Sequence, residues 1–117
     1  MLHSCPCCGY FVFVGRGDYE ICPICFWEDD FIQLQYPFSD GGANKVSLAV
    51  AQINYIQFAA CEFDMVKHVR SASKDYVHDD RWFPLWVKPI KWTNETESDQ
   101  DELSPIVSKE SAPYWLG

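Results

Sequence analysis

The hydrophobic positions divide the chain into a strand-rich beginning, one apolar helix and an aromatic end. Residues 10–14 combine aromatic and β-branched side chains, which are typical of a strand. Turn-forming residues follow at 15–18, and residues 19–21 are placed to return as a second strand. The pattern therefore predicts a β-hairpin that ends immediately before Cys22.

A helix is predicted over residues 48–60, after an irregular loop at 31–45, with Ser47 as its N-cap. Apolar side chains form one stripe at helical spacing, and further apolar residues widen it, so we expect this helix to be well buried. The stripe consists of Leu48, Ala51, Tyr55 and Phe58, widened by Val50, Ile53 and Ala60. A second, short helix is expected near residues 63–69.

The C-terminal third alternates between aromatic and acidic stretches. Pro84 cannot donate a ladder hydrogen bond, so residues 82–87 are predicted to be extended or irregular. Residues 93–102 contain five acids and no basic residue, and we expect a solvated loop there. Residues 113–117 are apolar enough to dock on a folded core.

Length and composition limit this chain to one small domain with a tail. It has 117 residues, of which 48% are hydrophobic and 16% aromatic, and this excludes a chain that is disordered throughout. No apolar run has the length of a signal peptide or a membrane span, so we expect a cytoplasmic protein. In that reducing compartment, clustered cysteines favour a metal over disulfides.

Two C-x2-C pairs, Cys5–Cys8 and Cys22–Cys25, carry the strongest chemical signal in the sequence. Each pair presents two thiolates on one side of a turn, and thirteen residues separate the pairs. Zinc prefers four such soft ligands in a tetrahedron. Gly9 follows the first pair, where a tight turn often needs a residue without Cβ. The spacing predicts one structural zinc ion bound by Cys5, Cys8, Cys22 and Cys25.

Other uses of the cysteines stay open at this stage. The Cys22–Cys25 pair alone is similar to a redox dithiol, although such a site normally opens a helix after a strand. Cys7 is a buried small hydrophobe, a spare ligand or a reactive thiol. The first use is favoured, because adjacent residues rarely both reach one metal. Cys61 is expected in the core. His3 is a competing candidate ligand, although four cysteines would already complete the ligand shell.

Four runs of the sequence resemble the cysteine-rich CPCC domain family of bacterial proteins. These runs are CPCCGY at 5–10, RGDYEICPICFWEDD at 16–30, GGANKVSL at 41–48 and NYIQFAAC at 54–61. The resemblance covers roughly residues 1–75 and implies a small metal-binding domain in a cytoplasmic bacterial protein, without an established enzymatic activity. In that family the position of Ala59 is usually glycine, so the end of the helix is expected to differ here.

These features together predict an α+β fold. A small zinc-ribbon-like β-hairpin unit is expected to pack with one main helix in a cysteine-rich domain at residues 1–75. Residues 76–117 are expected to form an extended aromatic and acidic C-terminal tail that contains the acidic loop 93–102.

The acids Glu28, Asp29 and Asp30 closely follow the second cysteine pair. Adjacent carboxylates do not share one face, so a solvated turn or a helix start suits them better than acid–base chemistry. A zinc ion bound by four thiolates has no open position for water, and no nucleotide-binding or nucleophile-elbow motif occurs. We therefore expect a protein that is not an enzyme, and an enzyme that uses Cys7 is the alternative.

The net charge of −8 opposes binding to nucleic acid and favours a basic protein partner. Acidic side chains would steer that partner, and a few aromatic anchors would provide affinity. The candidate partner-binding residues are Trp82, Phe83, Trp86, Trp115, Asp79, Asp80, Glu95 and Glu97. Size, charge and an individual tail suit an immunity protein that inhibits a basic toxin encoded by a neighbouring gene. A nucleic-acid-binding zinc ribbon is the alternative.

Overall fold

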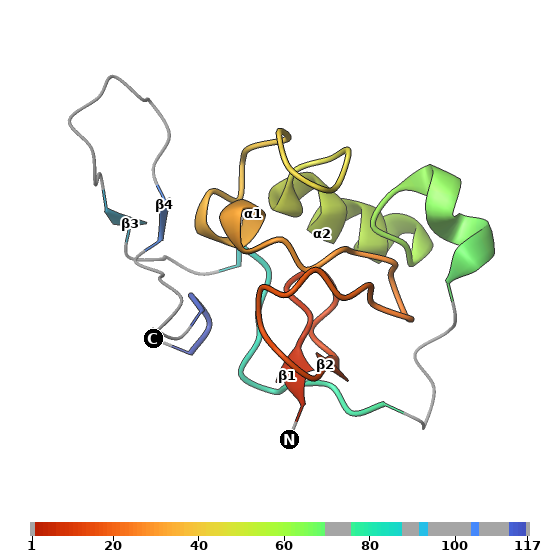
Figure 1. Cartoon of the computed structure of the whole chain (residues 1–117), viewed down its shortest axis with the longest axis horizontal. Helices are drawn as coiled ribbons and strands as arrows, with labels where there is room; N and C mark the ends of the chain where they lie inside the picture. The colour runs from red at the N-terminus through yellow and green to blue at the C-terminus, as the bar shows by residue number, and fades with distance from the viewer. Residues whose placement is uncertain (1, 70–75, 88–91, 94–103, 106–112, 117) are drawn as a thin grey trace.

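The computed structural model describes residues 2–69, 76–87, 92–93, 104–105 and 113–116. Two short strand pairs, two α-helices and one 3-10 helix make up the regular structure of these residues (Figure 1). In chain order the elements are β1 (His3–Ser4), β2 (Phe11–Phe13), α1 (Phe31–Gln35), α2 (Leu48–Phe58), η1 (Phe63–His68), β3 (Trp92–Thr93) and β4 (Ser104–Pro105). No helix in this part of the chain is long and apolar enough to cross a membrane.

The hairpin lies earlier in the chain than the sequence pattern predicts. Strand β1 pairs antiparallel with β2, with His3 opposite Phe13. The prediction that residues 19–21 pair with residues 10–14 is wrong, because Ile21 instead forms a bridge with Glu28. Each C-x2-C turn reverses the chain within a few residues, so each cysteine pair brings its own flanking residues together. The second sheet pairs β3 with β4 in antiparallel orientation.

Helix α2 begins at the predicted cap, where the Ser47 side chain accepts a hydrogen bond from the Val50 amide. The helix ends at Phe58, and Ala59 follows as a left-handed C-cap with φ of 64°. Its core side is the predicted one, with Leu48 and Ala51 fully buried. The expectation of a widely buried helix is wrong, because Val50 and Ile53 on the opposite side are exposed.

A short helix, α1, interrupts the region expected to be irregular. Asp30 caps it by accepting from the Ile32 amide at 2.9 Å, and its other carboxylate oxygen accepts from the Ala43 amide at 2.9 Å. Gln33, buried within α1, donates to the carbonyls of Ser39 and Val46. One acid and one amide thus hold the loop over residues 39–46 against α1.

Residues 76–87 return to the hairpin and extend it on its open side. The Phe11 amide donates to the Val77 carbonyl at 2.9 Å, and Tyr10 forms an antiparallel bridge with His78. The turn at 113–116 closes on the same core, because Tyr114 and Trp115 are both buried. Residues 82–87 contain no helix or strand, as predicted. The expected acidic loop at 93–102 lies almost entirely outside the described residues.

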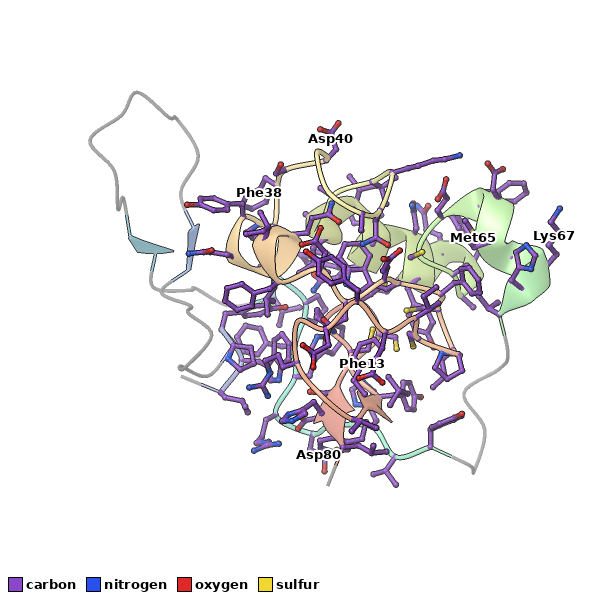
Figure 2. All side chains as sticks on the ribbon, viewed as in Figure 1. Phe13, Phe38, Asp40, Met65, Lys67 and Asp80 are labelled. Carbon is purple, nitrogen blue, oxygen red and sulfur yellow. The ribbon has the colours of Figure 1, made fainter. Side chains whose placement is uncertain are left out.

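One core connects these elements. The cysteines occupy its middle, between the hairpin and α2, and Phe13, Trp27 and Leu34 pack around them. Figure 2 shows the sulfur atoms grouped below α2, with Phe13 nearby on the hairpin side. The cysteine pairs are therefore part of the hydrophobic core and not a surface feature.

Candidate metal centre

The first cysteine knuckle (residues 5–10) is a tight turn built around Cys5. The Gly9 amide donates to the Cys5 carbonyl at 2.8 Å, and the Cys5 amide donates to the Tyr10 carbonyl at 2.9 Å. The Cys7 amide points at the Cys5 sulfur, 3.4 Å away. Gly9 has a φ of +83°, which confirms the predicted need for a residue without Cβ.

The second cysteine knuckle (residues 22–27) repeats this turn. The Phe26 amide donates to the Cys22 carbonyl at 2.9 Å, and the Cys22 amide donates to the Trp27 carbonyl at 2.9 Å. The amides of Ile24 and Cys25 point at the Cys22 sulfur, at 3.3 and 3.4 Å. Phe26 takes the place of Gly9 and has a φ of 71°, unusual for a residue with a side chain.

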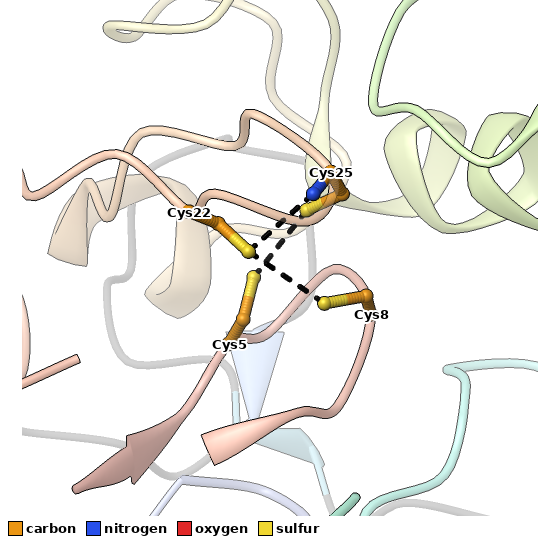
Figure 3. Close-up of side chains that lie close together, drawn as sticks. All are labelled: Cys5, Cys8, Cys22 and Cys25. Atoms are coloured by element: carbon orange, nitrogen blue, oxygen red, sulfur yellow. Dashed lines mark hydrogen bonds between the residues drawn. The ribbon is translucent and has the colours of Figure 1, made fainter. Parts of the chain in front are cut away.

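The two knuckles face each other and bring four sulfurs together. The Sγ atoms of Cys5 and Cys25 are 3.6 Å apart, and those of Cys8 and Cys22 are 3.8 Å apart (Figure 3). All four sulfurs lie within 4.8 Å of one another, and all four residues are buried. Thiolates bound to one tetrahedral zinc at about 2.3 Å are about 3.8 Å apart, so the arrangement fits such an ion.

Burial and the contacts among the four thiols together set their pKa values. Burial raises the pKa of Cys5, Cys8 and Cys25, because a thiolate without a counter-ion is unfavourable in the core. Burial also opposes ionisation of Cys22, but hydrogen bonds from the other cysteines and from the Cys25 amide lower its pKa overall. A cluster that can stabilise only part of the required negative charge is suited to a divalent cation, which would stabilise all four thiolates.

The two remaining cysteines lie close by without joining the cluster. Cys7 is fully buried, and its sulfur donates to the Ala51 carbonyl of α2 at 3.4 Å. Cys61 is also buried, and burial raises its pKa. All six cysteines are free thiols. Among the described residues, His3 does not belong to this group of close ligand atoms, and its Nδ1 instead lies 3.1 Å from Arg16 Nη2.

The comparison with known families agrees with this geometry. The model of the cysteine-rich CPCC family matches residues 3–76. The chain belongs to the cysteine-rich CPCC family. No curated protein matches the chain. Both C-x2-C pairs and helix α2 lie within the matched residues, whereas residues 77–87 and 113–116 lie beyond them.

Residues in the GGAN run of this CPCC domain support the second knuckle. Asn44 bonds to Glu28 through both ends of its side-chain amide, and its Nδ2 also donates to Gln33 Oε1 at 2.9 Å. A Cβ on Gly42 would come within 2.5 Å of Asp30 Oδ2 and 2.6 Å of the Gln33 side chain. The glycine is therefore required because α1 and its cap pack against the loop backbone.

The acids at 28–30 serve the fold. Asp30 caps α1, and Asp29, which is buried, accepts from the Gly17 amide at 2.7 Å. Glu28 uses its backbone to pair with Asn44. The predicted helix start is therefore confirmed for Asp30. Asp29 anchors the turn at 15–18 instead.

Some of the predicted partner-binding residues are buried in the structure, and others are accessible. Asp79 is 1% exposed, and its carboxylate accepts hydrogen bonds from Arg81 and from the Ser4 hydroxyl. Trp115 is also buried, so neither side chain is available for direct contact. Trp82 and Phe83 are half-buried, Trp86 is 50% exposed, and Asp80 is exposed at the hairpin end of the molecule (Figure 2). Glu95 and Glu97 lie outside the described residues.

Sequence reasoning missed the polar residues that surround the first knuckle. Gln52 is 1% exposed and donates to the Pro6 carbonyl at 2.9 Å. His78 Nε2 lies 3.1 Å from the Cys8 carbonyl, and Trp82 Nε1 donates to the Pro6 carbonyl at 3.0 Å. A signal for Gln52 was present, because it is a polar residue on the core side of an apolar helix. The sequence contains no such signal for the contacts of His78 and Trp82, since their partners lie 70 or more residues away.

Proposed function

We propose that this CPCC domain binds one structural zinc ion through Cys5, Cys8, Cys22 and Cys25. The observation that supports this proposal is the set of four buried sulfurs at tetrahedral spacing. Zinc is the metal that the donor set favours, because four cysteine thiolates form its commonest structural site. Four protein ligands leave no position for an activated water, so the metal would stabilise the fold and not catalyse a reaction.

Neighbouring cysteines provide a matched test of the zinc site. Cys8→Ser removes a proposed ligand, whereas Cys7→Ala removes a buried thiol that donates to the Ala51 carbonyl. Elemental analysis of protein purified without added metal should find about one zinc per chain in the wild type and in Cys7→Ala. Cys8→Ser should retain little. A folded wild-type protein without metal would overturn the proposal.

The same domain is proposed to be a protein-binding module that is not an enzyme. An apolar surface supports this role: the α2–η1 face, which consists of Val50, Ile53, Ile56, Phe63 and Val66. Ile56 is 62% exposed and Phe63 is 71% exposed, and α2 carries no charged side chain. Large exposed apolar side chains on two elements that contact each other support a docking surface. The buried position of Cys7 disfavours the thiol-dependent alternative.

The proposed partner is a basic protein, and we propose specifically a bacterial toxin that this protein inhibits. The net charge of −8 supports it, although Asp29, Asp30 and Asp79 are buried and hydrogen-bonded within the fold. The accessible acid Asp64 borders the α2–η1 face, and Lys45 Nζ lies 3.9 Å from its carboxylate. Acidic side chains would speed association, and the apolar side chains would provide affinity.

Co-expression with the product of the neighbouring gene tests the partner proposal. The complex should be recovered by pulldown at low salt and less readily at moderate salt, because screening shortens the reach of the charges. Phe63→Ala and Trp86→Ala test which exposed side chain anchors the partner, with stability expected to stay nearly unchanged. Recovery of no protein, with tight binding of RNA or DNA instead, would overturn the proposal.

A further inference from the structure

Residues 76–85, which we call the brace, contact the first knuckle through three of their residues. The Asp79 amide donates to the Gly9 carbonyl at 2.7 Å, and His78 Nε2 lies 3.1 Å from the Cys8 carbonyl. Trp82 Nε1 donates to the Pro6 carbonyl at 3.0 Å. Three backbone carbonyls around Cys8 are thus bonded to the brace.

The brace also fits closely against the knuckle surface. A Cβ on Gly9 would lie 2.6 Å from His78 Nε2 and 2.7 Å from the Trp82 ring. The His78 ring packs edge-on against Tyr10 at 4.7 Å and against Trp82 at 5.5 Å between centroids. The first knuckle therefore cannot shift outward without displacing both rings.

Gln52 connects the brace to α2 and to the C-terminal turn. Its Nε2 donates to the Pro6 carbonyl and to the Tyr114 hydroxyl, at 2.9 and 3.0 Å. Its Oε1 accepts from the Leu85 amide at 2.9 Å. One buried side chain therefore joins the first knuckle to two segments that lie beyond the residues matched by the family.

The second knuckle is supported in a different way. The Cys61 amide donates to the Cys25 carbonyl at 2.8 Å, and Asn44 bonds to Glu28 just after the knuckle. Both of these residues lie within the family match at 3–76. The second knuckle is thus supported by residues within the family match, whereas the first knuckle is supported both by α2 and by the brace, which lies almost wholly beyond that match.

We propose that the brace controls release of the metal from the four-cysteine site, and that metal occupancy in turn keeps the brace docked. The proposal rests on the zinc site proposed above. Loss of a metal requires at least one knuckle to move its sulfurs away, and the brace opposes that motion at Cys8. Since the coupling is reciprocal, removal of the metal should loosen the brace contacts. His78 and Trp82 are positioning residues that act through the backbone of the first knuckle.

Paired tryptophan substitutions in one segment test the first half of the proposal. Trp82→Phe keeps an aromatic ring but removes the N–H that bonds to Pro6, whereas Trp86→Phe changes a half-exposed ring. The zinc-loaded full chain is mixed with an excess of a colorimetric chelator, and the rate of zinc transfer is measured. Loss of one hydrogen bond should accelerate release roughly two- to twelvefold in Trp82→Phe. Trp86→Phe should stay within about twofold of the wild type by the same scale.

A third variant separates a local effect from general destabilisation. Leu34→Ala creates a cavity in the core on α1 without touching the brace contacts named above. Urea unfolding of the zinc-loaded variants ranks their global stabilities. If Leu34→Ala, at equal or greater loss of stability, accelerates release as much as Trp82→Phe, release follows general destabilisation and the brace proposal fails.

Hydrogen exchange tests the reciprocal half. The amides of Phe11 and Asp79 report brace docking, because they donate to the Val77 and Gly9 carbonyls. Both should lose protection on chelation by more than the α2 amides, such as Ala51, which donates to the Ser47 carbonyl. Unchanged protection at Phe11 and Asp79 would overturn the coupling. If the purified chain holds no zinc, both proposals fail. If it holds zinc and Trp82→Phe behaves as Trp86→Phe does, only the brace fails.

Discussion

The side chain of Asn44 pairs with the backbone of Glu28 at both ends. The Glu28 amide donates to Asn44 Oδ1 at 2.9 Å, and Asn44 Nδ2 donates to the Glu28 carbonyl at 2.9 Å. Asn44 thereby bonds as a neighbouring strand would, directly after the second knuckle. This buried amide therefore connects the loop over residues 39–46 to the four-cysteine site.

Asn44→Asp should strongly destabilise the protein. The substitution removes the Nδ2 donor to Glu28 and Gln33, and it places a negative charge against two acceptor oxygens. We expect a loss of about 3 kcal/mol in the free energy of unfolding. Urea unfolding followed by circular dichroism measures it. A loss below about 0.5 kcal/mol, the level of a surface change, would show that the pairing contributes little to stability.

Two neighbouring glycines should respond differently to alanine. At Gly42 a Cβ would meet Asp30 Oδ2 at 2.5 Å, whereas at Gly41 the nearest atom is Ser39 Oγ at 3.8 Å. Gly42→Ala should therefore cost about 2 kcal/mol through overpacking, and Gly41→Ala should change stability by less than about 1 kcal/mol. Thermal unfolding of both variants checks this order. Equal midpoints would contradict the close packing of the loop on α1.

Ala59→Gly should stabilise the chain. Ala59 has a φ of 64° at the C-cap of α2, a left-handed conformation that strains a residue with Cβ. The expected gain is about 1 kcal/mol, and Ala49→Gly within the same helix should instead lose about 1 kcal/mol. The pair of unfolding curves measures both signs. A loss of stability in Ala59→Gly would mean that the alanine makes a compensating contact.

Asp29 should make stability depend on pH. Burial raises the pKa of Asp29 to about 6, although the Gly17 amide donates to it. The native state therefore binds this proton more tightly than the unfolded chain does. The stabilisation that the protonated Asp29 side chain provides is complete below about pH 4 and is lost as pH rises through about 6.

Asp29→Asn isolates that contribution. At pH 7.5 the variant should be more stable than the wild type by about 1–3 kcal/mol, because it avoids a buried charge. The difference should shrink as pH falls from 7.5 to 5, when the wild-type carboxylate becomes protonated. Urea unfolding of both proteins at matched pH values measures this difference. A constant difference over that range would contradict a raised pKa.

The local patterns of the sequence determined the cysteine pairs, the need for Gly9, the cap at Ser47 and the core stripe of α2. Each of these depends on residues that lie within a few positions of one another, and their spacing alone specifies a turn or a helix face. The family match likewise follows from these runs. These features could be predicted because short-range geometry leaves few alternatives.

Only the tertiary structure decided which residues surround the four-cysteine site. Strand β2 pairs with residues 3–4 and not with the predicted residues 19–21, because the cysteine turns reverse the chain sooner than the strand pattern indicates. The burial of Asp79 depends on Ser4, which lies 75 positions earlier in the chain. No local pattern distinguishes such a residue from a surface acid. Contacts between distant segments depend on how the whole core packs. That packing buries Asp79, a predicted partner-binding acid, within the brace.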